Sequence, residues 1–123
     1  MRDFKRIRAL LFGLSEDVAG ELCQPLAALC GQIRSIARDG IGKVADSEAN
    51  IIFCGSDIQV VKQLRRTMPD AAIVVVSRHP EVASWLDSIE AGATDYCAAP
   101  FETHQVKWIL ETSMRSMPLA VFA

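Results

Sequence analysis

The sequence predicts an α/β fold built on a doubly wound, five-stranded parallel sheet. Short runs of apolar, β-branched residues recur along the chain, and segments with apolar residues at helical spacing lie between them. One clear strand-helix-strand unit at residues 73–98 indicates parallel pairing, because such crossovers join parallel strands. Regular alternation of strands and helices is typical of a sheet with helices on both faces.

Five segments have the composition of strands. The fourth, Ile73–Val76, is an unbroken β-branched run, which suits a strand buried on both faces. In the second, Ile33 and Ile36 alternate with polar residues, as in an edge strand. The strands are expected at Ile7–Phe12, Gln32–Ala37, Asn50–Cys54, Ile73–Val76 and Asp95–Ala98.

The helices between these strands carry start and stop signals. Ser15 precedes two acids, as an N-cap does, and Gly31 ends a helix that Pro25 should kink or divide. Residues 43–49 leave room for about two helical turns at most. The residues expected to face the core are Val18, Leu22, Leu26 and Leu29 in the first helix; Val60, Val61 and Leu64 in Ile58–Thr67; Val82, Leu86 and Ile89 in the helix that starts at His79-Pro80-Glu81 and ends at Gly92; and Val106, Ile109, Leu110 and Met114 in Glu102–Ser116.

Length and composition exclude several classes of protein. A chain of 123 residues is expected to be one domain, either standalone or a module of a longer protein. Its 13 basic and 15 acidic residues give no reason to expect nucleic-acid binding. No stretch approaches the roughly 20 apolar residues of a membrane span, and the basic N-terminus lacks the apolar core of a signal peptide. The four cysteines lack metal-ligand spacing, so we expect reduced thiols in a cytoplasmic protein.

The most specific stretch is 73–101, in which a strand ends at Ser77, an Ala91-Gly92-Ala93 turn leads to Tyr96, and Pro100-Phe101 follow. This order resembles the second half of a two-component response-regulator receiver domain. The resemblance covers nearly the whole chain in pattern but is specific only in this stretch. It implies a flavodoxin-like three-layer sandwich with strand order 2-1-3-4-5. It also implies switch-like roles for Ser77 and Tyr96, and a cis peptide before Pro100.

The residues that carry the family's chemistry are replaced. Receivers hold Mg²⁺ with an acidic pair after the first strand, phosphorylate an Asp at the end of the third, and contact the phosphoryl group with Ser or Thr and with the Lys of a Lys-Pro-Phe motif. Those positions fall on Gly13 and Leu14, on Gly55 or Cys54, on Ser77, and on Ala99 before Pro100. The resemblance therefore implies a degenerate pseudo-receiver that is not an enzyme, has no catalytic residue, and uses no Mg²⁺, other metal or cofactor.

Two other functions stay open. A displaced acid such as Asp57 could accept a phosphoryl group, although its place before a helix favours capping. Glu16 and Asp17 could approach a cation, although first-turn acids commonly serve the helix dipole. A small flavodoxin-like enzyme or nucleotide-binding module is disfavoured, because Gly13 is a single glycine followed closely by acids.

Aromatic residues near the end of the chain indicate an interface. We expect Trp85 and Trp108 to lie beside the core rows of their helices and, if exposed, to form a patch with Tyr96 and Ile109. Receivers commonly dimerise or bind partners through the face made by their fourth helix, fifth strand and fifth helix. The expected partner is a signalling protein or a second copy of the chain.

We expect His79 and His104, and the pair Arg65 and Arg66 at a helix end, to be solvated.

Overall fold

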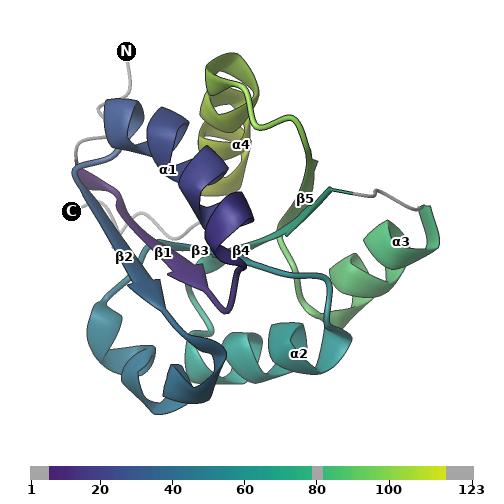
Figure 1. Cartoon of the computed structure of the whole chain (residues 1–123). Coiled ribbons are helices and arrows are strands. Elements are labelled where there is room, and N and C mark those ends of the chain that lie inside the picture. The colour runs from purple at the N-terminus through teal and green to yellow at the C-terminus, as the bar shows by residue number, and fades with distance from the viewer. Residues whose placement is uncertain (1–5, 79–81, 116–123) are drawn as a thin grey trace.

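The structure, a computed structural model, describes residues 6–78 and 82–115, with side chains for 6–78 and 85–113. Five parallel strands form one sheet in the order β2-β1-β3-β4-β5. Helices cover both of its faces (Figure 1), which makes three layers. The expected fold class and strand order are confirmed.

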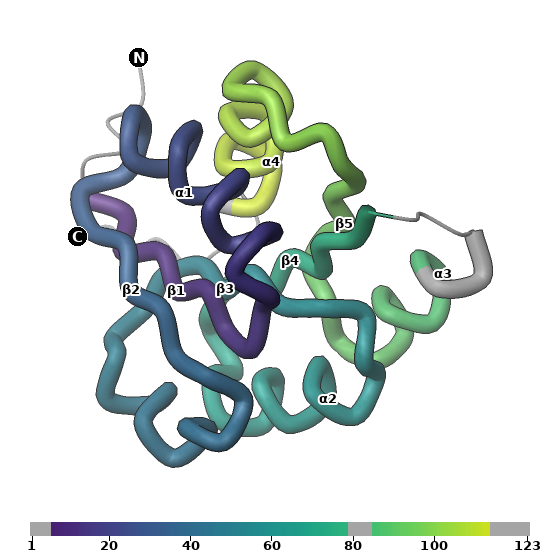
Figure 2. Tube along the Cα trace, viewed as in Figure 1, coloured from purple at the N-terminus to yellow at the C-terminus, as the bar shows by residue number. Residues whose placement is uncertain are grey.

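The element bounds follow the predicted alternation closely. The strands are β1 (Arg8–Phe12), β2 (Gln32–Ile36), β3 (Ile51–Cys54), β4 (Ala72–Ser77) and β5 (Asp95–Ala98). The α-helices are α1 (Glu16–Leu29), α2 (Ile58–Thr67), α3 (Val82–Ala91) and α4 (Thr103–Arg115), and the 3₁₀ helices are η2 (Arg38–Lys43) and η3 (Ala45–Ser47). Figure 2 shows the chain moving first to β2 at one edge and then across to β5 at the other.

The core consists of two buried clusters, one on each face of the sheet. Side chains alternate along each strand, so Leu11 joins the cluster under α1 and α4 while Leu10 and Phe12 join the cluster under α2. All four residues of β3 are buried, as a strand covered on both faces requires. The helical residues buried in the two clusters are Leu22, Leu26, Val106, Ile109 and Leu110 on the first face, and Val60, Val61 and Leu64 on the second. Val44, between η2 and η3, joins the second cluster.

The segment between β2 and β3 forms the 3₁₀ helices η2 and η3. Of residues 43–49, where about two helical turns at most were expected, the end of η2 and the whole of η3 are helical. The first of them begins at Arg38, before the residues at which helical turns were expected. Gly40 and Gly42 lie within η2 and raise the cost of a regular α-helix. Glu48 then ends η3 with a positive φ of 54°.

Helix α1 confirms its predicted start but not its predicted division. The backbone N–H of Val18 donates to Ser15 Oγ at 3.4 Å, which is the N-cap bond. The helix runs unbroken through Pro25, which is buried together with Leu22 and Leu26. We infer that this apolar contact offsets the single backbone hydrogen bond that proline removes.

Helix α3 faces the core with a different side from the predicted one. Leu86 is 50% exposed and Ile89 is 39% exposed, whereas Ser88 is fully buried. The predicted core row of Val82, Leu86 and Ile89 is therefore wrong for the two side chains that the structure describes. The side chains of Val82 and Met114, and the whole of His79, Pro80 and Glu81, lie outside the described residues.

The end of α3 confirms the predicted glycine stop. Gly92 has a φ of 119°, and its N–H donates to the Ile89 carbonyl at 3.1 Å. The next N–H, from Ala93, donates to the Ser88 carbonyl at 3.0 Å. These two bonds form a Schellman motif, which closes the helix and leads into β5.

Candidate functional site

The carboxyl ends of the five strands lie together along one side of the sheet, which is called the carboxyl edge. The strand register pairs Phe12 with Cys54 and Ser77 with Ala98, so the residues that follow these strands lie at neighbouring positions. Ligands of doubly wound folds bind at this edge, near the point where the strand order reverses. The residues that the family resemblance assigns to receiver site positions lie at or just after these strand ends: Gly13, Leu14, Cys54, Gly55, Ser77, Ala99 and Pro100.

Gly13 and Leu14, the two positions after β1, have structural roles in the turn and in the core. Gly13 has a φ of 64°, and its N–H donates to the Ile36 carbonyl at 2.9 Å. A Cβ built on Gly13 would lie 3.4 Å from Arg38 Cβ, so both the turn and the neighbour favour glycine. Leu14 is partly buried against the cluster under α1 and α4. Neither residue carries an oxygen ligand on its side chain for a hard cation.

Cys54 ends β3 with a fully buried side chain. Burial raises the pKa of its thiol to about 12, because the apolar surroundings disfavour the thiolate. The thiol is therefore neutral near pH 7 and is a poor nucleophile there. Gly55, the next residue, has no side chain to modify.

An ion pair between Arg38 and Asp57 lies beside these positions. Asp57 is the N-cap of α2, and its Oδ1 accepts the Gln59 N–H at 2.9 Å. Its Oδ2 pairs with Nη2 of Arg38, the first residue of η2. The Gln59 N–H has the largest effect and holds the pKa of Asp57 below its ordinary value. Desolvation opposes this shift, and the Arg38 charge and the Val60 N–H add smaller lowering effects. Both carboxylate oxygens are thus already engaged.

A small cavity of about 110 Å³ lies at the ion pair. It is lined by Phe12, Gly13, Arg38, Gly55, Ser56, Asp57 and Val60. The one cation in this lining is Arg38, and Asp57 already neutralises it. The sequence predicted the capping role of Asp57, but it did not predict Arg38, because a loop arginine carries no signal of its distant partner.

Ser77 and Tyr96, the two switch-like positions, lie on neighbouring strands. Ser77 ends β4 and is half-buried, and its carbonyl accepts the Ala99 N–H at 2.9 Å. The peptide bond between Ala99 and Pro100 is cis, as the family resemblance implied. Tyr96 is half-buried against the cluster under α2, and its hydroxyl oxygen is buried without a hydrogen-bond partner among the described residues.

An open groove of about 1090 Å³ runs between α1 and the β5–α4 connection. It is lined by Glu16, Asp17, Gly20, Glu21, Gln24, Arg78, Ala99, Pro100, Phe101 and Glu102. Among the described residues of its lining, Arg78 is the one cation, and it pairs with Glu21 at 2.7 Å. Within the described residues no group of three or more His, Cys, Asp or Glu could hold a metal ion. No helix among them is long and apolar enough to cross a membrane.

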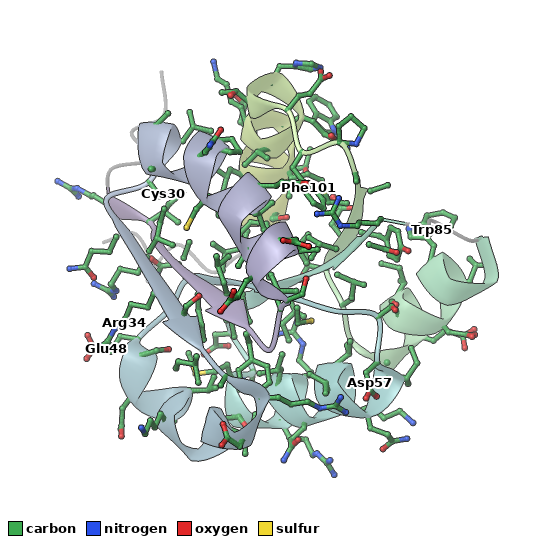
Figure 3. The ribbon with its side chains drawn as sticks, in the orientation of Figure 1. Cys30, Arg34, Glu48, Asp57, Trp85 and Phe101 are labelled. Atoms are coloured by element: carbon green, nitrogen blue, oxygen red, sulfur yellow. The ribbon has the colours of Figure 1, made fainter. Side chains whose placement is uncertain are left out.

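The predicted interface residues divide into exposed and buried ones. Trp85 is 45% exposed, at the start of α3 (Figure 3), and Trp108 on α4 is 60% exposed. Gln105, one turn before Trp108, donates from Nε2 to the Ala98 carbonyl at 3.2 Å, so this side of α4 faces β5. Ile109 is only 5% exposed and belongs to the core, so its assignment to an exposed patch is wrong.

Arg65, expected to be solvated, is a part-buried structural clamp. Its Nε donates to the Gly92 carbonyl at 3.0 Å, and its Nη2 donates to Thr94 Oγ1 at 3.2 Å. Its Nη1 donates to the carbonyls of Met68, Pro69 and Ala71. The guanidinium therefore ties the end of α2 to the turn between α3 and β5. The Ala91-Gly92-Ala93 sequence marked this turn but not the side chain that holds it.

Comparison with known proteins finds the same fold in receiver domains. A proposed pilus assembly-related protein of Burkholderia pseudomallei superposes with a TM-score of 0.82 at 14% identity, over 96% of each chain. A two-component response regulator from Clostridium difficile superposes at 0.78 with 18% identity, over 90% of this chain and 98% of its own. The beryllofluoride-activated NtrC4 receiver domain dimer gives 0.72 and 18%, over 88% and 97%. At such identities the likeness shows the receiver fold alone.

Sequence comparison gives a partial match to regulators. The photosynthetic apparatus regulatory protein RegA of Rhodovulum sulfidophilum is 33% identical over 64 residues, which are 52% of this chain and 35% of that protein. The RegA protein of Cereibacter sphaeroides matches to the same extent. The chain thus spans about a third of the length of the curated relatives it matches. No family model matches the chain.

Proposed function

We propose that this chain is a receiver-like signalling domain that works by protein–protein contact and is not switched by aspartyl phosphate. The observation that carries the proposal is the composition of the carboxyl edge. Gly13, Leu14, Cys54, Gly55 and Ala99 stand at the receiver site positions, and none has a carboxylate or ammonium group. A phosphoryl group placed there would lack the metal and lysine that offset its charge in the family.

The geometry of Asp57 argues against the alternative of a displaced phosphoacceptor. One carboxylate oxygen caps α2 and the other pairs with Arg38. Phosphorylation would consume one oxygen and break at least one of these contacts. With Ala99 in place of the family's lysine, Arg38 is the one cation that lines the cavity at Asp57 among the described residues. Asp57 therefore serves better as a cap than as a nucleophile.

We further propose that the chain is not an enzyme and uses no Mg²⁺ or other cofactor. A nucleotide or flavin phosphate would need free backbone N–H groups at the start of α1. The Ser15 hydroxyl already accepts one of them, and Glu16 and Asp17 in the first turn would repel the phosphate. The His104 side chain is well exposed, with its Nε2 at 3.4 Å from Oε2 of the exposed Glu102, so it lies in solvent and not in a closed site. These features disfavour a flavodoxin-like enzyme or a nucleotide-binding module.

Partner contact is proposed to use the face made by α3, β5 and α4. Trp85 and Trp108 are exposed there on two different helices, and large aromatic residues are where interface energy concentrates. The partner would be a signalling protein or a second copy of the chain, met in the cytoplasm without membrane or nucleic acid. Such a role fits both the regulators and the pilus assembly-related protein that share the fold.

Intact-mass measurement after incubation with acetyl phosphate and Mg²⁺ tests the proposal. We expect no covalent phosphoryl group, while a receiver with its acidic pair and lysine, treated in parallel, gains one. Asp57→Asn provides the matched variant. A stoichiometric, base-labile phosphoryl adduct on the natural chain that is missing from Asp57→Asn would overturn the proposal and establish Asp57 as the phosphoacceptor.

A further inference from the structure

Helix α3 presents a row of large apolar side chains to solvent. Of the six side chains from Trp85 to Glu90, only Ser88 is buried. Trp85 and Ile89 are one turn apart, and Leu86 and Ile89 are three residues apart, so the three share one side of the helix. Trp85, Leu86 and Ile89 are together called the α3 row. Exposed apolar groups gathered in this way mark interaction sites.

An acidic row runs beside the α3 row on the same helix. With about 3.6 residues per turn, the order around the helix from its buried side is Ser88, Trp85, Ile89, Leu86, Glu90 and Asp87. Asp87 and Glu90 are exposed and have no ion-pair partner within the described part of the chain. Helix α3 contains no Lys or Arg. Charge is therefore found on one flank of the row only, and it is all negative.

This charge pattern discriminates between two kinds of occupant. A second copy that packed its own α3 against this helix would supply no cation and would bring two acidic flanks into one interface. Like charges placed together oppose association, whereas complementary charges steer it. A partner helix with Lys or Arg along one edge would instead neutralise Asp87 and Glu90 while its apolar side covered the row.

We propose that the α3 row takes an amphipathic α-helix of another protein, with apolar residues at helical spacing and Lys or Arg on one flank. This inference rests on the proposed function, since it names the chemistry of the partner at the α3–β5–α4 face. The two exposed sides of α3 provide both determinants of recognition. The apolar row supplies buried contact, and the acids set the orientation of the bound helix.

The inference can be tested with two synthetic helical peptides of about 18 residues. Both carry leucines at helical spacing on an alanine background, one with lysines along a single flank and the other with glutamates there. NMR titration of the labelled chain measures the affinity and maps the amides that shift. We expect the lysine peptide to shift α3 amides and to bind roughly tenfold more tightly than its twin. The variant Asp87→Lys with Glu90→Lys should reverse that preference.

Matched controls separate this result from general charge effects. Asp39→Lys with Asp46→Lys makes the same change of four charges at exposed positions in η2 and η3, which follow β2 at the other edge of the sheet, and should leave the preference intact. Equal binding of the two peptides, or lysine-peptide binding unaffected by Trp85→Ala, would overturn the inference. So would sedimentation that reveals a dimer of the natural chain disrupted by Trp85→Ala. An acetyl phosphate adduct in the same samples would overturn the proposed function instead, whatever the peptides do.

Discussion

The two ends of α2 are both held by arginines, and the two attachments differ in kind. At the carboxyl edge of the sheet, Asp57 pairs with Arg38, and both side chains are well exposed, at 41% and 67%. At the amino edge, Arg65 is part-buried and donates to four backbone carbonyls and one hydroxyl. The first attachment joins two flexible side chains, while the second joins a side chain to fixed backbone.

This difference indicates which of the two arginine contacts contributes more to the stability of the fold. Exposed ion pairs contribute little to stability, because water and salt screen them. A part-buried guanidinium bonded to several carbonyls contributes more, because its loss leaves those acceptors without partners. At the carboxyl edge, where receivers carry their phosphorylation site, the start of α2 is therefore held by a weak contact. At the opposite edge, beside the proposed docking helix α3, the end of α2 is held by stronger contacts.

Removing the Arg65 clamp should have the largest effect. We expect Arg65→Met to lower the free energy of unfolding by about 2–4 kcal/mol, since it leaves the Gly92 and Ala71 carbonyls without their donors. Urea unfolding followed by circular dichroism measures the change. Arg66→Met, at the exposed neighbouring position, is the control and should change stability by less than about 0.5 kcal/mol. Equal losses in the two variants would contradict the clamp.

The glycine beneath the clamp should rank next. Gly92→Ala places a Cβ at a φ of 119° and 3.0 Å from Arg65 Cγ, so we expect a loss of about 1–3 kcal/mol. Gly20→Ala in α1 meets no neighbouring atom within 4 Å and should stabilise the chain by up to about 1 kcal/mol. Thermal unfolding of both variants gives the comparison. An unchanged stability of Gly92→Ala would contradict this expectation, because it would mean that the turn adopts another conformation without losing free energy of unfolding.

The opposite end of α2 should tolerate change better. We expect Asp57→Ala to lower stability by less than Arg65→Met, because one cap bond and an exposed ion pair are lost. The pKa of Asp57 is lowered on folding, so its contribution is present above its ordinary value of 3.8 and is lost as the pH falls through the folded pKa. The stability gap between the natural chain and Asp57→Ala should therefore shrink below that pH. A gap that stays constant down to pH 2 would contradict this role.

A small effect on stability is expected at the exposed tryptophan of α4. Trp108→Ala removes a side chain that is 60% exposed, and we expect a change within about 1 kcal/mol in the free energy of unfolding. Ile109→Ala, at the next position, removes a core side chain and should cost about 2–5 kcal/mol. The pair tests directly which of the two residues the fold requires. Similar losses for both would mean that Trp108 is a packing residue.

Much of the fold was predictable from local patterns. β-Branched runs marked the strands, and cap residues such as Ser15, Asp57 and Gly92 marked helix ends, because these signals act over a few neighbouring residues. The segment around Gly40 was less predictable, since glycines favour loops and 3₁₀ turns alike. The absence of acids at Gly13 and Leu14 could also be predicted from the sequence, because the family resemblance assigned the receiver's acidic pair to these two positions.

The sequence could not show which side of α3 faces inward. The spacing of Leu86 and Ile89 correctly placed them on one side, but periodicity does not say which neighbour covers that side. The small Ser88 lies inward instead, in the helix whose end Arg65 holds. Arg38 and Arg65 were missed for a related reason. Asp57 lies 19 residues from Arg38, and Gly92 and Thr94 lie 27 and 29 residues from Arg65, so only the folded chain brings these partners together.

The central claim is that the carboxyl edge binds no phosphoryl group. Its most direct test is NMR of the labelled chain with beryllofluoride, which mimics an aspartyl phosphate, in the presence of Mg²⁺. We expect the amide resonances of Gly13, Gly55, Ser77 and Ala99 to stay unchanged at saturating concentrations. Shifts confined to these amides, absent in Asp57→Asn, would mean that the edge still binds a phosphoryl group and its metal. That result would contradict the proposal that this receiver fold acts through contact alone.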